Sequence, residues 1–179
     1  MGLLDKLFGK ADERIEPPAR PEPVVVEPTP SGIYATCDGE LMHMADLPDP
    51  LFAAGAMGVA VGVKPTRGVV YAPVSGTITL MTGTLHALGI RSDEGIDILI
   101  HVGVDTVNMK GDGFHGYVEQ GQHVVAGESL MTMDLAKISD AGYSDVVILV
   151  VINSDEYTTI TPVPAGPVAA GTQVMTVEG

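Results

Sequence analysis

The sequence predicts an all-β protein, built as a sandwich or barrel of short strands. Glycine (22 of 179 residues) and proline (13) are abundant, which favours frequent turns over long helices. Short runs rich in Val, Ile, Leu and Thr are separated by Gly, Pro, Asp and Asn at close intervals, and helical periodicity is weak. Aromatic residues make up only 4% and Trp is absent, so aliphatic side chains and Met must fill the core.

The N-terminal part of the chain is expected to lie outside this core. Residues 1–14 place four apolar side chains on one side of a short helix, a weakly amphipathic tail suited to contact with an anionic membrane surface. A frayed terminus is the alternative. Residues 15–31 hold six of the thirteen prolines and are predicted to form an extended, flexible linker. The folded domain is predicted to span 32–179.

Strand-like runs fill this domain, with two short helices predicted among them. The runs span 58–65, 68–81, 86–92, 96–104, 122–134, 144–153 and 172–179. The helices are predicted at Pro50–Ala56 and Ala136–Ala141. One repeat relates 124–133 (VVAGESLMTM) to 168–177 (VAAGTQVMTV), with five of ten positions identical. Duplicated β units commonly pack around one core, so we predict an internal duplication; chance similarity in a chain rich in Ala, Val and Gly is the alternative.

The charge and the cysteine content narrow the class of protein. The net charge is −14, and residues 31–179 carry seventeen acidic and only five basic side chains. Such a surface repels phosphate backbones, so nucleic-acid binding is not expected, whereas basic protein partners are attracted. The single cysteine, Cys37, excludes an internal disulfide. The apolar run Val146–Ile152 is too short to cross a bilayer and no secretory signal is recognisable, so a cytoplasmic protein is predicted.

His101 lies in the run 96–104, where side chains alternate between the two faces of a strand. One face is wholly aliphatic and is expected to be core: Ile96, Ile98, Ile100, Val102 and Val104. His101 therefore shares the other face with Asp97, Leu99 and Gly103. The bare glycine is predicted to leave room for another group beside an accessible imidazole.

His86 lies in another run, Thr84–Ile90, where it shares a face with Thr84. If the two runs pair, the two imidazoles come close together. A neutral imidazole can carry a phosphoryl group, and a second histidine and a hydroxyl can donate hydrogen bonds to that group. Two alternatives stay open: both histidines are structural, or His86, His101 and Asp105 are ligands of a zinc ion.

Four segments carry a resemblance to a known family. They are 47–58 (LPDPLFAAGAMG), 63–78 (VKPTRGVVYAPVSGTI), 82–114 (TGTLHALGIRSDEGIDILIHVGVDTVNMKGDGF) and 119–135 (EQGQHVVAGESLMTMDL). The third is the most specific, because it holds two histidines fifteen residues apart and HVGVDTVNMKGDGF begins at the second. Together these segments resemble the glucose-type enzyme IIA family of the bacterial phosphoenolpyruvate-dependent sugar phosphotransferase system. The resemblance covers essentially 32–179 and implies an antiparallel β-sandwich, or flattened barrel, with internal duplication.

The resemblance also implies a function, that of a phosphocarrier. By this resemblance His101 is the phosphorylated residue, and His86 assists at the phosphoryl group. Thr84 matches a polar residue beside it, and Asp105 matches an acid in the HxGxDT segment of the family. The implied donor is the phosphohistidine of the carrier HPr, and the implied acceptor is a cysteine of an enzyme IIB domain. No organic cofactor or metal is implied for the transfer.

An apolar face beside the histidines is expected to dock these partners. The residues expected to form it are Phe52, Leu88, Leu99 and Val102. Because no membrane-spanning segment is recognisable, the sugar permease is expected to be a separate chain, and its sugar is not identified by the sequence. The alternative function is a regulatory binding module whose phosphorylation controls sugar permeases or metabolic enzymes. A zinc hydrolase is disfavoured, since no HxH pair occurs.

Overall fold

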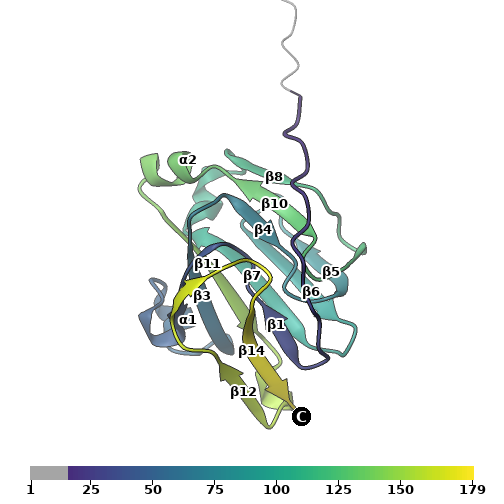
Figure 1. The fold of residues 1–179 in the computed structure, drawn as a ribbon. Coiled ribbons are helices and arrows are strands. Elements are labelled where there is room, and N and C mark those ends of the chain that lie inside the picture. The colour runs from purple at the N-terminus through teal and green to yellow at the C-terminus, as the bar shows by residue number, and fades with distance from the viewer. Residues whose placement is uncertain (1–15) are drawn as a thin grey trace, which may run out of the picture.

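The computed structural model describes residues 16–179, which form three antiparallel sheets with a few short helical segments (Figure 1). The large sheet has the order β13 (Gly166–Val168), β2 (Gly39–His43), β3 (Val59–Pro65), β11 (Ser144–Val151), β7 (Asp97–Val104), β6 (Ala87–Ser92), β5 (Gly76–Met81), β9 (His123–Val124). One small sheet has the order β1 (Gly32–Tyr34), β14 (Gln173–Glu178), β12 (Thr159–Pro162). The other has the order β4 (Val69–Tyr71), β10 (Ser129–Met133), β8 (Phe114–Gly116). The helical segments are η1 (Met44–Asp46), α1 (Pro50–Ala53), η2 (Thr106–Met109), α2 (Leu135–Asp140) and η3 (Ser154–Glu156). The predicted all-β class is confirmed.

The order of the large sheet is symmetric about its central β11–β7 pair. Outward from this pair, β3 matches β6, β2 matches β5 and β13 matches β9. The two small sheets match as well: β1 corresponds to β4, β14 to β10 and β12 to β8. The repeated sequences 124–133 and 168–177 fall on the matched pairs β9–β10 and β13–β14. The predicted internal duplication is therefore confirmed.

The repeated sequence forms the same turn twice. Gly127 and Gly171 have φ values of 89° and 82°, a left-handed conformation that glycine adopts without steric cost. Their N–H groups donate to the carbonyls of Ala72 and Ala35, each at 2.9 Å. Ala72 follows β4 and Ala35 follows β1, so the two turns attach to matched segments of the two halves.

The central strands of the large sheet are buried on both faces. On one face they pack into the main core with the two small sheets. On the other face α1 and its neighbours cover a smaller apolar cluster. Its buried members are Leu47, Phe52, Ala60, Val146, Ile148 and Val150. The continuous apolar run of β11, residues 146–151, follows from this arrangement, because alternate side chains enter the two clusters.

The alternation predicted along β7 holds as far as Val102 and then fails. Gly103 has φ +76°, and the pairing of β11 with β7 is irregular at this point. The left-handed residue reverses the direction of the side chain that follows. Val104 consequently packs with Leu99 against the smaller cluster, so its predicted place in the main core is wrong.

Both predicted helices form, and an aspartate directly before each of them caps its N-terminus. The Asp49 carboxylate accepts a hydrogen bond from the N–H of Leu51 at 2.9 Å, and Asp134 accepts one from Lys137 at 3.1 Å. These bonds satisfy N–H groups that the first helical turn leaves without partners. Helix α1 ends at Ala53, three residues before the predicted end.

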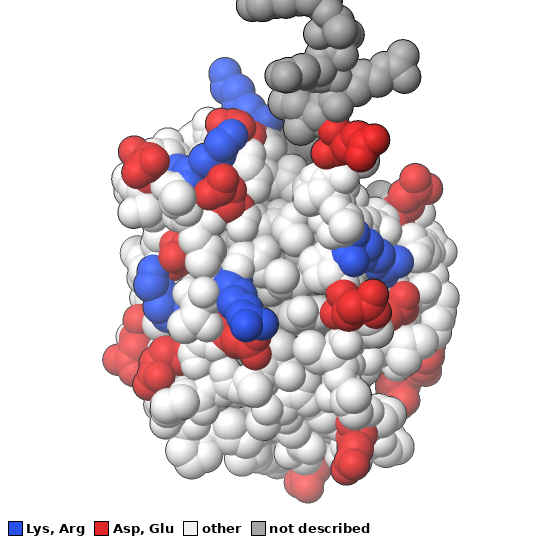
Figure 2. Space-filling view, turned by 45° about the horizontal axis from the view of Figure 1, so that its top comes forward, with Lys and Arg blue, Asp and Glu red and all other residues white. Residues whose placement is uncertain are grey.

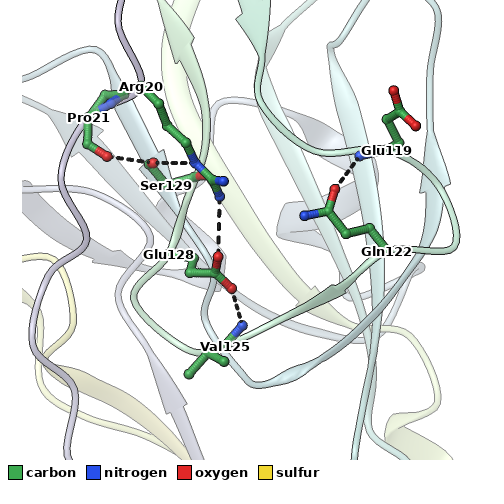
Figure 3. A network of polar contacts seen from close by, with 7 residues as sticks. All are labelled: Arg20, Pro21, Glu119, Gln122, Val125, Glu128 and Ser129. Atoms are coloured by element: carbon green, nitrogen blue, oxygen red, sulfur yellow. Dashed lines mark hydrogen bonds and ion pairs between the residues drawn. The ribbon is translucent and has the colours of Figure 1, made fainter.

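Residues 16–31 are extended, but they lie along the surface of the domain (Figure 1). We call this segment the strap. Figure 3 shows its anchor: Arg20 donates to the Ser129 carbonyl at 2.9 Å and forms an ion pair with Glu128 at 3.4 Å. The Ser129 hydroxyl donates in turn to the carbonyl of Pro21 at 2.7 Å. The segment predicted as a flexible linker is thus held by hydrogen bonds in this structure.

The predicted amphipathic tail, 1–14, lies outside the described residues. Among residues 16–179, no helix combines the length and the apolar character needed to cross a membrane.

The surface carries much more acidic than basic charge. Of the five basic side chains in 31–179, three form ion pairs, Lys64–Asp145, Arg91–Asp97 and Lys137–Asp112. In Figure 2, basic side chains lie beside acidic ones on the face in view, and further acidic side chains stand alone towards its edges. The field that a distant partner meets is therefore negative.

Candidate functional site

The candidate site is centred on His101, near the middle of the large sheet. β7 presents this half-buried imidazole on the face that carries the smaller apolar cluster. The Phe52 ring of α1 lies 5.3 Å from it, centroid to centroid, at an angle of 54°. The His86 ring lies at 5.5 Å, with the two planes at 78°. Three segments that are distant in the sequence therefore meet at one imidazole.

The two halves of the duplicated fold supply the two neighbours of His101. Phe52 belongs to the connection between β2 and β3, and His86 belongs to the connection between the matched strands β5 and β6. The first connection is long enough to hold η1 and α1, whereas the second is a tight turn, 82–86. The site thus forms where the two halves differ.

The turn before β6, rather than the strand, positions His86. β6 begins at Ala87, and Leu85 in the turn has φ 58°, a left-handed conformation. The carbonyl of His86 accepts a hydrogen bond from the N–H of Val102 at 2.7 Å, which fastens the turn to β7. The predicted run Thr84–Ile90 is therefore a strand only from Ala87 onward.

The backbone determines which nitrogen of His101 carries the proton. Nδ1 lies 2.7 Å from the carbonyl oxygen of Gly103. A carbonyl oxygen only accepts, so Nδ1 is the donor, and in the neutral ring Nε2 holds the lone pair. The space predicted above Gly103 is occupied, because a Cβ there would stand 2.4 Å from Cγ2 of Thr106. Gly103 serves the site through its carbonyl and its φ value.

Two threonine hydroxyls surround Nδ1 of His86. Oγ1 of Thr84 lies at 2.6 Å and Oγ1 of Thr82 at 3.2 Å. Burial, and secondly the charge of the neighbouring His101, lower the pKa of His86 below its ordinary value of 6.5. Thr84 was predicted at this place, and Thr82 was missed. Thr82 lies four residues before His86 in the sequence. This spacing brings the two side chains together only if the chain turns between them, whereas the sequence predicts a strand from Thr84 onward.

Asp105 does not join the two imidazoles. It is exposed, has φ 62°, and directly precedes η2, and its carbonyl accepts a hydrogen bond from the N–H of Asn108 at 3.1 Å. Within residues 16–179, no three His, Cys, Asp or Glu side chains gather in a way that could hold a metal ion. The three-ligand zinc site with His86, His101 and Asp105 is therefore not formed.

Three of the four residues predicted for the docking face are buried. Leu88 and Val102 are each 0% exposed, because the pleat of β6 and β7 turns them into the main core. Phe52 is also buried and forms a wall against His101. Leu99 is half-buried in the smaller cluster.

Two apolar side chains are exposed instead on elements that adjoin the site. Leu51 is 62% exposed and precedes Phe52 in α1, and Val107 is 44% exposed in η2, directly after β7. Reasoning from strand faces missed both, because both lie on helical segments.

Comparisons with known proteins identify the family. A family model described as phosphoenolpyruvate-dependent sugar phosphotransferase system, EIIA 1, matches residues 31–157. The glucose-specific EIIA component of Bacillus cereus is 40% identical over 146 residues, which are 81% of this chain and 88% of that protein. The glucose-specific EIIA component of Haemophilus influenzae is 35% identical over 175 residues, 98% of this chain and 97% of that protein. The structure of glucose permease IIA from Mycoplasma capricolum matches with a TM-score of 0.74 at 32% identity, over 80% of this chain and 93% of that one.

A longer protein contains a similar segment. The β-glucoside-specific EIIBCA component of Bacillus subtilis is 38% identical over 136 residues, which are 76% of this chain and 22% of that protein. The resemblance noted from the sequence is thus confirmed. The chain belongs to the EIIA 1 family of the phosphoenolpyruvate-dependent sugar phosphotransferase system, and it is an EIIA component that carries phosphoryl groups between HPr and an enzyme IIB domain in sugar uptake.

Proposed function

We propose that His101 carries the phosphoryl group and that its Nε2 is the accepting atom. The observation that carries this proposal is the 2.7 Å hydrogen bond from Nδ1 to the Gly103 carbonyl. It leaves the lone pair of the neutral ring on Nε2, and a nitrogen lone pair is what attacks phosphorus. Within residues 16–179, Nε2 of His101 makes no hydrogen bond that would occupy it.

The proposed reaction consists of two successive phosphoryl transfers. First, Nε2 of His101 attacks the phosphorus of the HPr phosphohistidine in line. The N–P bond to HPr breaks, and its electron pair returns to the HPr imidazole. In the second step a cysteine thiolate of an enzyme IIB domain attacks the same phosphorus, and the N–P bond to His101 breaks with its electron pair returning to Nε2. Transition states of this kind are loose, so positioning and hydrogen bonds to the phosphoryl oxygens supply most of the catalysis.

We assign His86 to those oxygens. When the Thr84 hydroxyl donates to Nδ1 across 2.6 Å, the His86 proton lies on Nε2, which can donate to a phosphoryl oxygen. The lowered pKa supports this role, because it favours a neutral His86 beside His101 at neutral pH. A neutral donor also leaves the nucleophilic lone pair of its neighbour available.

The proposed docking surface combines exposed apolar side chains with the acidic charge of the domain as a whole. Leu51 is exposed beside Phe52 in the sequence of α1, and Val107 is exposed in η2, which follows the strand of His101; a partner that covers these elements would keep water from the phosphorus. The excess of acidic side chains in 31–179 favours partners with a basic surface and speeds their encounter.

The proposed location is the cytoplasm, where the donor HPr is expected. Contact of residues 1–14 with the inner face of the membrane rests on their amphipathic sequence alone. Relatives are named for glucose and for β-glucosides, so we propose an acceptor domain from a permease of this group.

Phosphorylation with phosphoenolpyruvate, enzyme I and HPr tests the proposal. We expect acid-labile phosphate on His101 by mass spectrometry, and none on His101→Gln. His86→Gln should still accept phosphate but should pass it to an enzyme IIB domain much more slowly. His123→Gln is the matched control, because His123 is exposed and paired with Asp93 outside the site. Phosphate on a residue other than His101 would overturn the assignment.

A further inference from the structure

Thr106 is one of the few polar residues that are fully buried, and it lies directly behind the site. Its exposed fraction is 0%. It is the first residue of η2, five positions after His101. Its hydroxyl donates to the carbonyl of Val102 at 2.5 Å.

This hydrogen bond replaces one that the sheet cannot make. In an antiparallel ladder the N–H and the C=O of one residue face the same neighbouring strand. The N–H of Val102 donates to His86, the last residue before β6 begins at Ala87. The ladder partner of the Val102 carbonyl would be the N–H of His86, but His86 lies in the turn 82–86, and within residues 16–179 its N–H does not donate to that carbonyl. The hydroxyl of Thr106 takes that place.

The methyl group of Thr106 contacts the next residue, Gly103. A Cβ on Gly103 would lie 2.4 Å from Cγ2 of Thr106, so the two residues are in close contact. Thr106 therefore contacts Val102 through its hydroxyl and Gly103 through its methyl group. The carbonyl of Gly103 is the group that accepts the Nδ1 proton of His101.

We propose that Thr106 is a positioning residue for phosphoryl transfer. Through its hydrogen bond to the Val102 carbonyl it holds the Gly103 carbonyl towards Nδ1 of His101, and so keeps the lone pair on Nε2. The N–H of Val102 donates to the carbonyl of His86, so the hydroxyl that binds the carbonyl of the same residue steadies the backbone behind both imidazoles. The catalytic consequence rests on the proposed role of His101, whereas the effect on its tautomer does not.

Two substitutions separate the hydroxyl from the methyl group. Thr106→Val keeps the shape and leaves the Val102 carbonyl without its donor, and Thr106→Ser keeps the donor. The tautomer of His101 is read from ring nitrogen shifts in ¹⁵N-histidine-labelled protein without phosphate, and the transfer rate is read by rapid quench with phospho-HPr. Thr36→Val is the matched control, since Thr36 is also buried but lies in the segment after β1.

We expect Thr106→Val to replace the single Nδ1-protonated form of His101 by a tautomer mixture. Transfer from phospho-HPr should fall about tenfold, the factor expected when the preference supplied by one hydrogen bond is lost. Thr106→Ser and Thr36→Val should keep the wild-type tautomer, and their rates should stay within about twofold of wild type.

Several outcomes would overturn the inference. One is a Thr106→Val protein that is less stable but keeps the wild-type tautomer and rate, which would make the residue structural only. Another is a loss of the tautomer in Thr106→Ser, which retains the hydroxyl; this result decides the matter even if Thr106→Val does not fold. Failure of the proposed function itself would look different, because phosphate would then be missing from His101 in the wild-type protein.

Discussion

Replacing Gly103 by alanine probes how tightly the backbone behind His101 is held. Gly103 has φ +76°, and an added Cβ would stand 2.4 Å from Cγ2 of Thr106 and 2.8 Å from the carbonyl oxygen of Ser144. A left-handed conformation costs a residue with a Cβ about 1–2 kcal/mol. Overpacking at a buried position costs about 1–3 kcal/mol. We therefore expect Gly103→Ala to lower the free energy of unfolding by about 2–5 kcal/mol.

Gly95→Ala is the matched control for the backbone cost alone. Gly95 also has a positive φ, 93°, but an added Cβ would meet nothing within 4 Å. Its substitution should cost about 1–2 kcal/mol. Urea unfolding followed by circular dichroism gives both values, provided the two variants show the same dependence on urea. If Gly103→Ala costs no more than Gly95→Ala, the close packing of Thr106 and Ser144 on Gly103 is refuted.

Two further predictions concern His86 and the strap. The pKa of His86 is lower in the folded protein than 6.5, so the unfolded chain binds its proton more readily; this contribution to stability is complete above pH 6.5 and declines as the pH falls. Urea unfolding at several pH values should show a smaller decline for His86→Gln, and equal declines would contradict the shift. Arg20→Ala removes the ion pair with Glu128 and should speed proteolysis within the strap up to about fivefold. Arg67→Ala, outside the strap contacts, should not, and equal acceleration by both would argue against the anchor.

The strands were predictable because their pattern is local. Alternation is a property of extended backbone, so the inward direction of Ile98, Ile100 and Val102 follows from their spacing. The same reasoning failed at Gly103 and in the turn 82–86. Both leave the extended conformation, and there a period of two no longer describes which way a side chain points.

The strap shows a similar division. Its prolines predict an extended shape, because each ring restricts the backbone of its own residue. They do not predict where the segment lies, since Arg20 finds its partners Glu128 and Ser129 at separations of 108 and 109 residues. Such contacts depend on the finished surface of the domain.

By itself the sequence determined that the protein is all-β and duplicated, and it singled out His86 and His101 among five histidines. Only the tertiary structure decided what those imidazoles meet: Phe52 at 5.3 Å, each other at 5.5 Å, and the Gly103 carbonyl at Nδ1 of His101. The physical reason is that strand faces follow from a period carried by neighbouring residues. The surroundings of His101 come instead from the unequal connections of two matched halves and from the direction of single carbonyl groups, which are set only when the whole sheet has formed.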